Sequence, residues 1–118
     1  MEFIDILARM EIDPQETIRR FCQNEGLLKK YLIKFSEEET YSKLKEAVEN
    51  KNYDDIEVCA HTLKGLSSNL GMNKLSKYCA KMVDAVRGNT YDHMDEMFSD
   101  VEKEYERLTK CLEDLKSL

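Results

Sequence analysis

The apolar spacing near the C-terminal end of the chain is the feature that most limits the fold. Apolar residues recur there at alternating steps of three and four, at Met94, Phe98, Val101, Tyr105, Leu108, Leu112 and Leu115. A spacing near 3.5 residues places one side of a long helix against neighbours that cross at shallow angles. No segment of the chain alternates between apolar and polar residues as a half-buried strand does. The sequence therefore predicts an all-α fold.

Shorter amphipathic segments precede this helix. We expect a helix from Phe3 to about Met10, and further apolar helical stripes within 18–22, 27–35, 41–48, 56–70 and 75–86. Short connections between long amphipathic helices favour antiparallel neighbours. The predicted fold is thus an antiparallel four-helix bundle with short additional N-terminal helices. The pattern leaves open whether Ser36–Glu39 begins a new helix or continues the preceding one.

Local signals predict where several helices begin and end. Asp13, followed by Pro14, is a predicted N-cap of a helix that runs through about Cys22 and whose inner side includes Ile18, Phe21 and Cys22. Asn52, with Asp55 three residues later, and Asn73 are predicted to cap two later helices. Gly71 is predicted to end the central helix in the left-handed conformation.

Length and charge narrow the class of protein. The 118 residues predict one domain, 1–118, with a single core. The net charge of −6, from 18 basic and 24 acidic residues, argues against a general nucleic-acid binder, which needs a basic surface. No apolar run approaches the roughly 20 residues that span a bilayer, and no signal peptide opens the chain. We expect a cytoplasmic protein that binds neither nucleic acid nor membrane.

The cysteines and His93 do not form a recognisable metal site. The cysteines, Cys22, Cys59, Cys79 and Cys111, are scattered without a Cys-x-x-Cys pair, so reduced thiols are expected and zinc is not. Acidic residues surround His93, but the spacing matches no known ligand set. We interpret His93 as a solvated residue near the start of a helix, where the helix dipole favours acids. No metal and no cofactor are expected on this chain.

The stretch from Ala60 to Gly71 carries the strongest functional signal. At 100° per residue, Ile56, Cys59, Ala60, Leu63, Leu66 and Leu70 fall on one face, which we predict to be buried. His61 lies nearly opposite, on a face that also holds Asp54, Glu57 and Ser68. Lys64 and Gly65 follow His61 by three and four residues, so both are its neighbours on the helix surface. An imidazole, an ammonium group and a missing side chain thus share one patch.

Gly65 is the most informative residue of this patch. A glycine inside a helix costs about 1 kcal/mol relative to alanine, and Gly65 faces away from the apolar stripe. Close approach of another molecule to the histidine is one physical reason to accept that cost. The alternative is that Gly65 is merely tolerated and that His61 is an ordinary solvated residue.

The residues Ala60-His61-Thr62-Leu63-Lys64-Gly65, followed by Leu70-Gly71 and Leu75, resemble the histidine-containing phosphotransfer (HPt) domains of phosphorelays. The resemblance implies that His61 carries a phosphoryl group, that Lys64 stabilises it, and that Gly65 leaves room for a receiver domain. Several members of the family hold the histidine ring with a glutamine of the next helix, and this chain has Val83 there. Ring orientation must then come from another group or from water.

The predicted function is that of a phosphorelay intermediate. His61 would accept a phosphoryl group from an aspartyl-phosphate receiver domain, or from a kinase, and pass it to a response-regulator aspartate. Ser68, one turn beyond Lys64, could donate a hydrogen bond to the phosphoryl group or the partner; the alternative is a solvated hydroxyl. The resemblance implies receiver domains and a sensor or hybrid histidine kinase as partners, with Mg²⁺ on the receiver. The sequence contains no phosphate-binding loop, so we expect a phosphocarrier without autokinase activity.

Two other functions are compatible with a helical bundle. An adaptor that binds a receiver domain or a partner helix without phosphotransfer would keep its function when His61 is replaced. The dimerisation domain of a sensor kinase also presents a histidine, usually followed by an acidic residue and a nearby proline. Thr62 and the absence of a nearby proline argue against that domain. The phosphocarrier is expected to be a monomer.

The candidate residues for docking a partner are Val58, Ile4 and Leu7. For Ile4 and Leu7 the alternative is burial against the bundle.

Overall fold

The computed structural model describes residues 2–118. All the regular structure in this range is helical, which confirms the predicted all-α fold. The helices are α1 (Phe3–Arg9), α2 (Pro14–Arg20), α3 (Glu25–Ser36), α4 (Thr40–Glu49), α5 (Tyr53–Asn69), α6 (Asn73–Arg87) and α7 (Met94–Lys116). Residues 37–39 separate α3 from α4, so Ser36 ends one helix and a new helix begins after Glu39.

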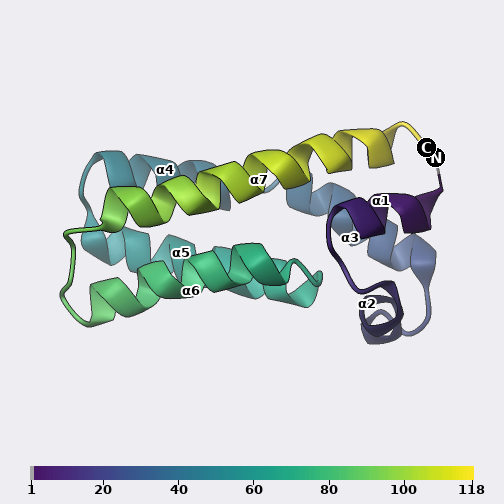
Figure 1. Cartoon of the computed structure of the whole chain (residues 1–118), viewed down its shortest axis with the longest axis horizontal. Helices are drawn as coiled ribbons and strands as arrows, with labels where there is room; N and C mark the ends of the chain where they lie inside the picture. Colours follow the sequence, from purple (N-terminus) through teal and green to yellow (C-terminus); the bar gives the residue numbers. More distant parts are fainter. Residues whose placement is uncertain (1) are drawn as a thin grey trace.

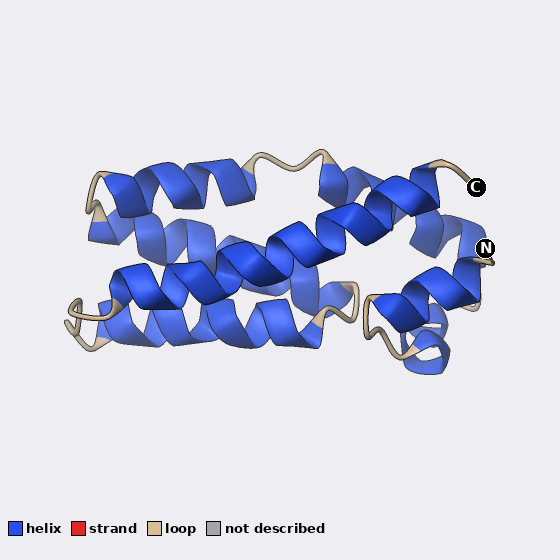
Figure 2. Ribbon diagram, turned by 45° about the horizontal axis from the view of Figure 1, so that its top comes forward, coloured by secondary structure: helices blue, strands red, loops and turns tan. Residues whose placement is uncertain are grey.

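The helices from α4 onward form a bundle. Helix α5 packs between α4 and α6, and α7 contacts both α4 and α6, so the four helices enclose a common core. Their direction along the bundle reverses at each connection (Figure 1). Helix α3, which precedes the N-terminal end of α4, also packs on α7. Helices α1 and α2 lie at the end of the bundle where α7 finishes (Figure 2).

The predicted apolar stripes form the core. In α7 the stripe lies on the buried side, with Phe98, Val101, Leu108, Leu112 and Leu115 almost fully covered. Tyr105 is half-buried, and its ring stacks on Tyr41 of α4. Glu104 lies outside the predicted apolar stripe, yet its side chain is buried. Arg107 pairs with that carboxylate at 2.7 Å and also donates to the carbonyl oxygens of Arg9 and Met10, at the end of α1.

Two of the predicted helix starts are confirmed. The Asp13 carboxylate accepts a hydrogen bond from the backbone of Glu16 at 3.2 Å, and Pro14 is the first residue of α2. Asn52 accepts from the backbone of Asp55 at 3.2 Å and donates to its carboxylate at 2.8 Å. Each cap satisfies a backbone N–H that has no partner within its helix.

Two other boundaries differ from the prediction. Helix α2 ends at Arg20, and Cys22 is an exposed residue with φ of 58°, so it does not belong to an inner side. The chain turns there because Gln23 donates from its backbone to Ile18 at 3.0 Å, which closes the helix. Asn73 is already helical and the N-cap is Met72, which has no capping side chain.

Candidate functional site

Helix α5 presents the candidate site, and Gly71 fixes where that helix ends. Gly71 has φ of 78°, and its backbone N–H donates to Ser68 at 3.1 Å while that of Met72 donates to Ser67 at 2.9 Å. This is the predicted left-handed helix end. A Cβ atom at Gly71 would lie 2.5 Å from Oγ1 of Thr17 in α2. Glycine is therefore required both by the backbone conformation and by the close approach of α2.

The two predicted faces of α5 are present in the structure. Ile56, Ala60, Leu63 and Leu70 are buried, whereas Cys59 and Leu66 are half-buried at the margins of the stripe. His61, Gly65 and Ser68 are exposed, and Lys64 is half-buried beside them. The structure therefore brings these four residues together on one solvent-facing patch, which we call the His61 face.

Gly65 leaves an open space on the His61 face. A Cβ atom built at this position would meet no atom within 4 Å. Among residues 2–118, packing thus does not require a glycine at this position, in contrast to Gly71. The packing described therefore does not offset the conformational cost of Gly65, and its role in the access of a partner stays a prediction.

Two serines fix the backbone at Lys64. Ser67 is fully buried, and its hydroxyl donates to the carbonyl oxygens of Leu63 at 2.7 Å and Lys64 at 3.1 Å. Ser76 of α6 also donates to the Lys64 carbonyl, at 3.3 Å. The Ser76 bond joins α6 to α5 at Lys64, whereas the two Ser67 bonds lie within α5. Neither serine was predicted to have a role, although Ser67 lies four residues after Leu63 on the buried side.

Two arginines from other helices reach the ends of the His61 face. Arg87, at the end of α6, donates from Nε to Oε2 of Glu57 at 3.3 Å, one turn before His61. Arg20, at the end of α2, donates to the carbonyl oxygens of Ser68 and Asn69 at 3.0 and 2.9 Å. Sequence analysis did not identify either arginine, because neither lies near the histidine in the chain.

Val83 is a core residue. It lies on α6 between Ser76 and Arg87 and is only 2% exposed. A buried apolar side chain has no donor or acceptor to offer an imidazole. The structure therefore confirms that Val83 cannot take the place of the glutamine that orients the histidine ring in other members of the resembling family.

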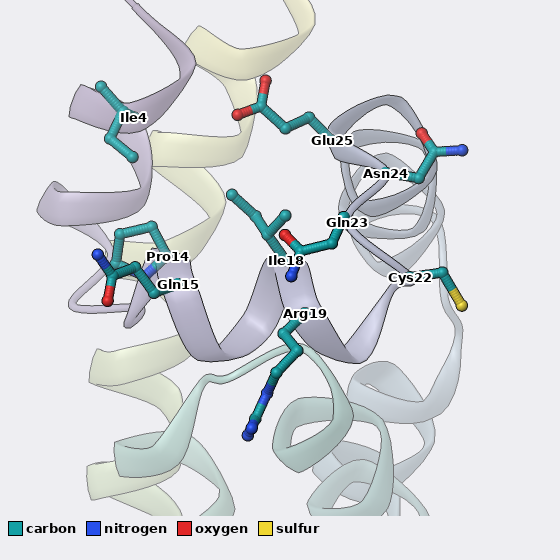
Figure 3. Close-up of a pocket in the computed structure, with 9 residues that line it drawn as sticks. All are labelled: Ile4, Pro14, Gln15, Ile18, Arg19, Cys22, Gln23, Asn24 and Glu25. Atoms are coloured by element: carbon teal, nitrogen blue, oxygen red, sulfur yellow. The ribbon is translucent and has the colours of Figure 1, made fainter.

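The candidate docking residues divide into exposed and buried ones. Val58 is 65% exposed beside the His61 face and Ile4 is 48% exposed on α1. Leu7 is fully buried, so burial, the alternative to a docking role, is confirmed for this residue. Ile4 belongs to an open groove between α1, α2 and the start of α3 (Figure 3). Ile18 points into this groove from α2, and its neighbour Arg19 also lines the groove.

The other candidate ligands lie apart from the His61 face. His93 is exposed, and its Nδ1 atom lies 3.5 Å from a carboxylate oxygen of Glu96. All four cysteines are free thiols, and burial raises the pKa of Cys79 to about 12. Among residues 2–118 no three His, Cys, Asp or Glu side chains are grouped so that they could hold a metal ion. None of the helices described is long and apolar enough to cross a membrane.

Comparison with known families identifies the family of this chain. The family model for the Hpt domain matches residues 32–117, which include His61 and all of α4 to α7. The chain belongs to the Hpt family. No curated protein and no solved structure matches the chain. Hpt domains are phosphocarriers of two-component signalling rather than catalytic enzymes, so membership implies a phosphotransfer role. Helices α1 and α2 lie outside the matched residues.

Proposed function

We propose that His61 is the phosphoacceptor of a phosphorelay intermediate. It takes a phosphoryl group from the aspartyl phosphate of a receiver domain, or from a kinase, and delivers it to the aspartate of a response regulator. The observation that carries this proposal is an exposed imidazole between Lys64 and the open space at Gly65, on a helix within the matched region.

The transfer requires little covalent chemistry from this chain. The unprotonated nitrogen of the His61 ring attacks phosphorus, an N–P bond forms, and the P–O bond to the aspartate breaks. The aspartate carboxylate leaves with the electron pair, and the ring keeps its proton on the other nitrogen. Delivery to the next aspartate is the reverse of this step. Positioning and charge stabilisation dominate such reactions.

The neighbours of His61 have separate roles in this proposal. The Lys64 ammonium group offsets the charge of the phosphoryl oxygens, as a point charge on a flexible stem. Gly65 lets the receiver bring its aspartate within reach of the ring. Ser68 is exposed on the same face, where its hydroxyl can donate to the phosphoryl group or to the receiver. The receiver supplies Mg²⁺ and the acidic pocket that holds it.

Transfer of radioactive label tests the proposal. A receiver domain carrying a labelled aspartyl phosphate is mixed with the wild-type chain and, separately, with His61→Gln. We expect label that is stable to base and labile to acid on the wild type alone. Absence of label from the wild type across several receivers would contradict the proposal and favour an adaptor without phosphotransfer. Label on both proteins would place the acceptor at another residue.

The oligomeric state separates the proposal from a sensor-kinase dimerisation domain. We propose a monomer, because the face that carries His61 is complete within one chain. Sedimentation equilibrium across a hundredfold range of concentration should give the monomer mass. A stable dimer would instead favour the kinase-like alternative.

A further inference from the structure

An ion pair between α5 and α6 lies one turn before the proposed phosphoacceptor. Arg87 donates from Nε to the Glu57 carboxylate at 3.3 Å. Glu57 precedes His61 by four residues in the same helix, so the Cβ atoms of the two are about 5–6 Å apart. Both members of the ion pair are partly exposed, and pairs of this kind contribute little to the stability of a fold.

A bare carboxylate at this position would oppose phosphorylation of the histidine. A protein-bound phosphoryl group carries nearly two negative charges at neutral pH, and a like charge one turn away destabilises it. Lys64 lies on the following turn, on the other side of His61 along the helix axis. The charge of Lys64 therefore does not take the place of the Arg87 cation beside Glu57.

We propose that Arg87 is a positioning residue for phosphotransfer and acts through Glu57. Its guanidinium group neutralises the carboxylate beside His61, so the phosphoryl group forms next to a compensated ion pair. The inference rests on the proposed role of His61. It adds a residue of α6, 26 positions further along the chain, to the machinery around the phosphoacceptor.

A double-mutant cycle that removes the two charges tests this inference. Rates of label transfer from a phosphorylated receiver are compared for the wild type, Arg87→Ala, Glu57→Gln and the double variant. Lys45→Ala is the matched control, because Lys45 also forms an exposed cross-helix pair, with Glu102 at 3.6 Å between α4 and α7. Thermal unfolding of every variant checks that the fold is retained.

We expect Arg87→Ala to transfer label more slowly than the wild type, and we expect the added Glu57→Gln substitution to restore the rate. One charge at this distance near a surface should change the rate about three- to tenfold. The double variant and Glu57→Gln alone should transfer at nearly the wild-type rate, as should Lys45→Ala. The ratio of wild type to Arg87→Ala should fall toward one at 1 M salt, where the Debye length is about 3 Å.

Three outcomes would overturn the inference. One is a wild-type rate in Arg87→Ala at low salt. Another is a slow double variant, which would mean that Arg87 acts directly on the receiver or the phosphoryl group. The last is an equal loss in Lys45→Ala, which would indicate a general effect of net charge. Failure of the wild type to take up any label would instead contradict the proposed phosphoacceptor itself.

Discussion

Arg20 of α2 closes the C-terminal end of α5, since its guanidinium group donates to the carbonyl oxygen of Ser68 at 3.0 Å. The same nitrogen donates to the carbonyl of Asn69 at 2.9 Å, and the other end of the guanidinium pairs with Glu16 at 3.1 Å. The last carbonyl groups of a helix have no partner within it and carry a partial negative charge. A cation from α2 thus satisfies the end of the helix that carries His61.

Replacing Arg20 with alanine should loosen this end of α5. We expect a loss of about 1 kcal/mol in the free energy of unfolding, because the hydrogen bonds are charged but partly exposed. Amide hydrogen exchange should become faster in residues 66–71. Arg19→Ala is the matched control, since Arg19 is an exposed neighbour on the same helix. Equal exchange rates in the two variants would show that the Arg20 contacts do not hold the helix end.

Gly71→Ala should destabilise the protein by about 2 kcal/mol or more. Alanine at φ of 78° is strained, and its Cβ atom would lie 2.5 Å from Oγ1 of Thr17. Urea unfolding measures the loss. Combining Gly71→Ala with Thr17→Ala should recover part of it, because the hydroxyl that clashes is removed. No recovery would mean that backbone strain alone accounts for the cost.

Much of the fold was predictable because its signals are local. The spacing of apolar residues in α7 and the caps at Asp13 and Asn52 each depend on residues within one segment. The errors at Cys22 and Asn73 have a different origin. Both lie at turns whose exact length depends on how the adjoining helices pack, and that information is not contained in a short window of sequence.

The residues of the candidate site also differ in whether local sequence could predict them. The arrangement of His61, Lys64 and Gly65 follows from the period of a single helix and was predictable. Arg20 and Arg87 lie 48 and 30 residues from the groups that they contact. Their positions depend on the register between helices, which the period of one helix does not determine. Val83, in contrast, belongs to the apolar stripe predicted within 75–86, and its burial in the core is confirmed.

The Tyr41 hydroxyl should make stability depend on alkaline pH. Burial, followed by the charges of Glu102 and Glu106, raises the pKa of Tyr41 to about 12. The folded protein thus keeps a proton that the unfolded chain loses near pH 10, so stability should fall as the pH rises from about 10 to 12. Urea unfolding at pH 9 and 11 measures this change. Tyr41→Phe should lose less stability over that interval, and an equal loss would contradict the assignment.

Lys64→Ala should slow phosphotransfer about tenfold and leave the fold intact. The ammonium group is proposed to offset the charge of the phosphoryl oxygens, and one charge-assisted interaction at a partly exposed site corresponds to roughly this factor. The serine bonds go to the backbone of Lys64 and survive the change. Rapid-quench transfer from a labelled receiver measures the rate. Lys74→Ala, exposed on α6, is the control, and equal rates in the two variants would exclude a specific role for Lys64.

Substitutions at Gly65 should separate stability from docking. Gly65→Ala should raise the free energy of unfolding by about 0.5–1 kcal/mol, since the new Cβ atom meets nothing within 4 Å and alanine favours the helix. Gly65→Gln should fold equally well but weaken the binding of the receiver and slow transfer, because its longer side chain occupies the open space beside His61. Calorimetric binding and transfer rates measure the second effect. Wild-type affinity and rate in Gly65→Gln would show that the partner does not approach His61 across this surface.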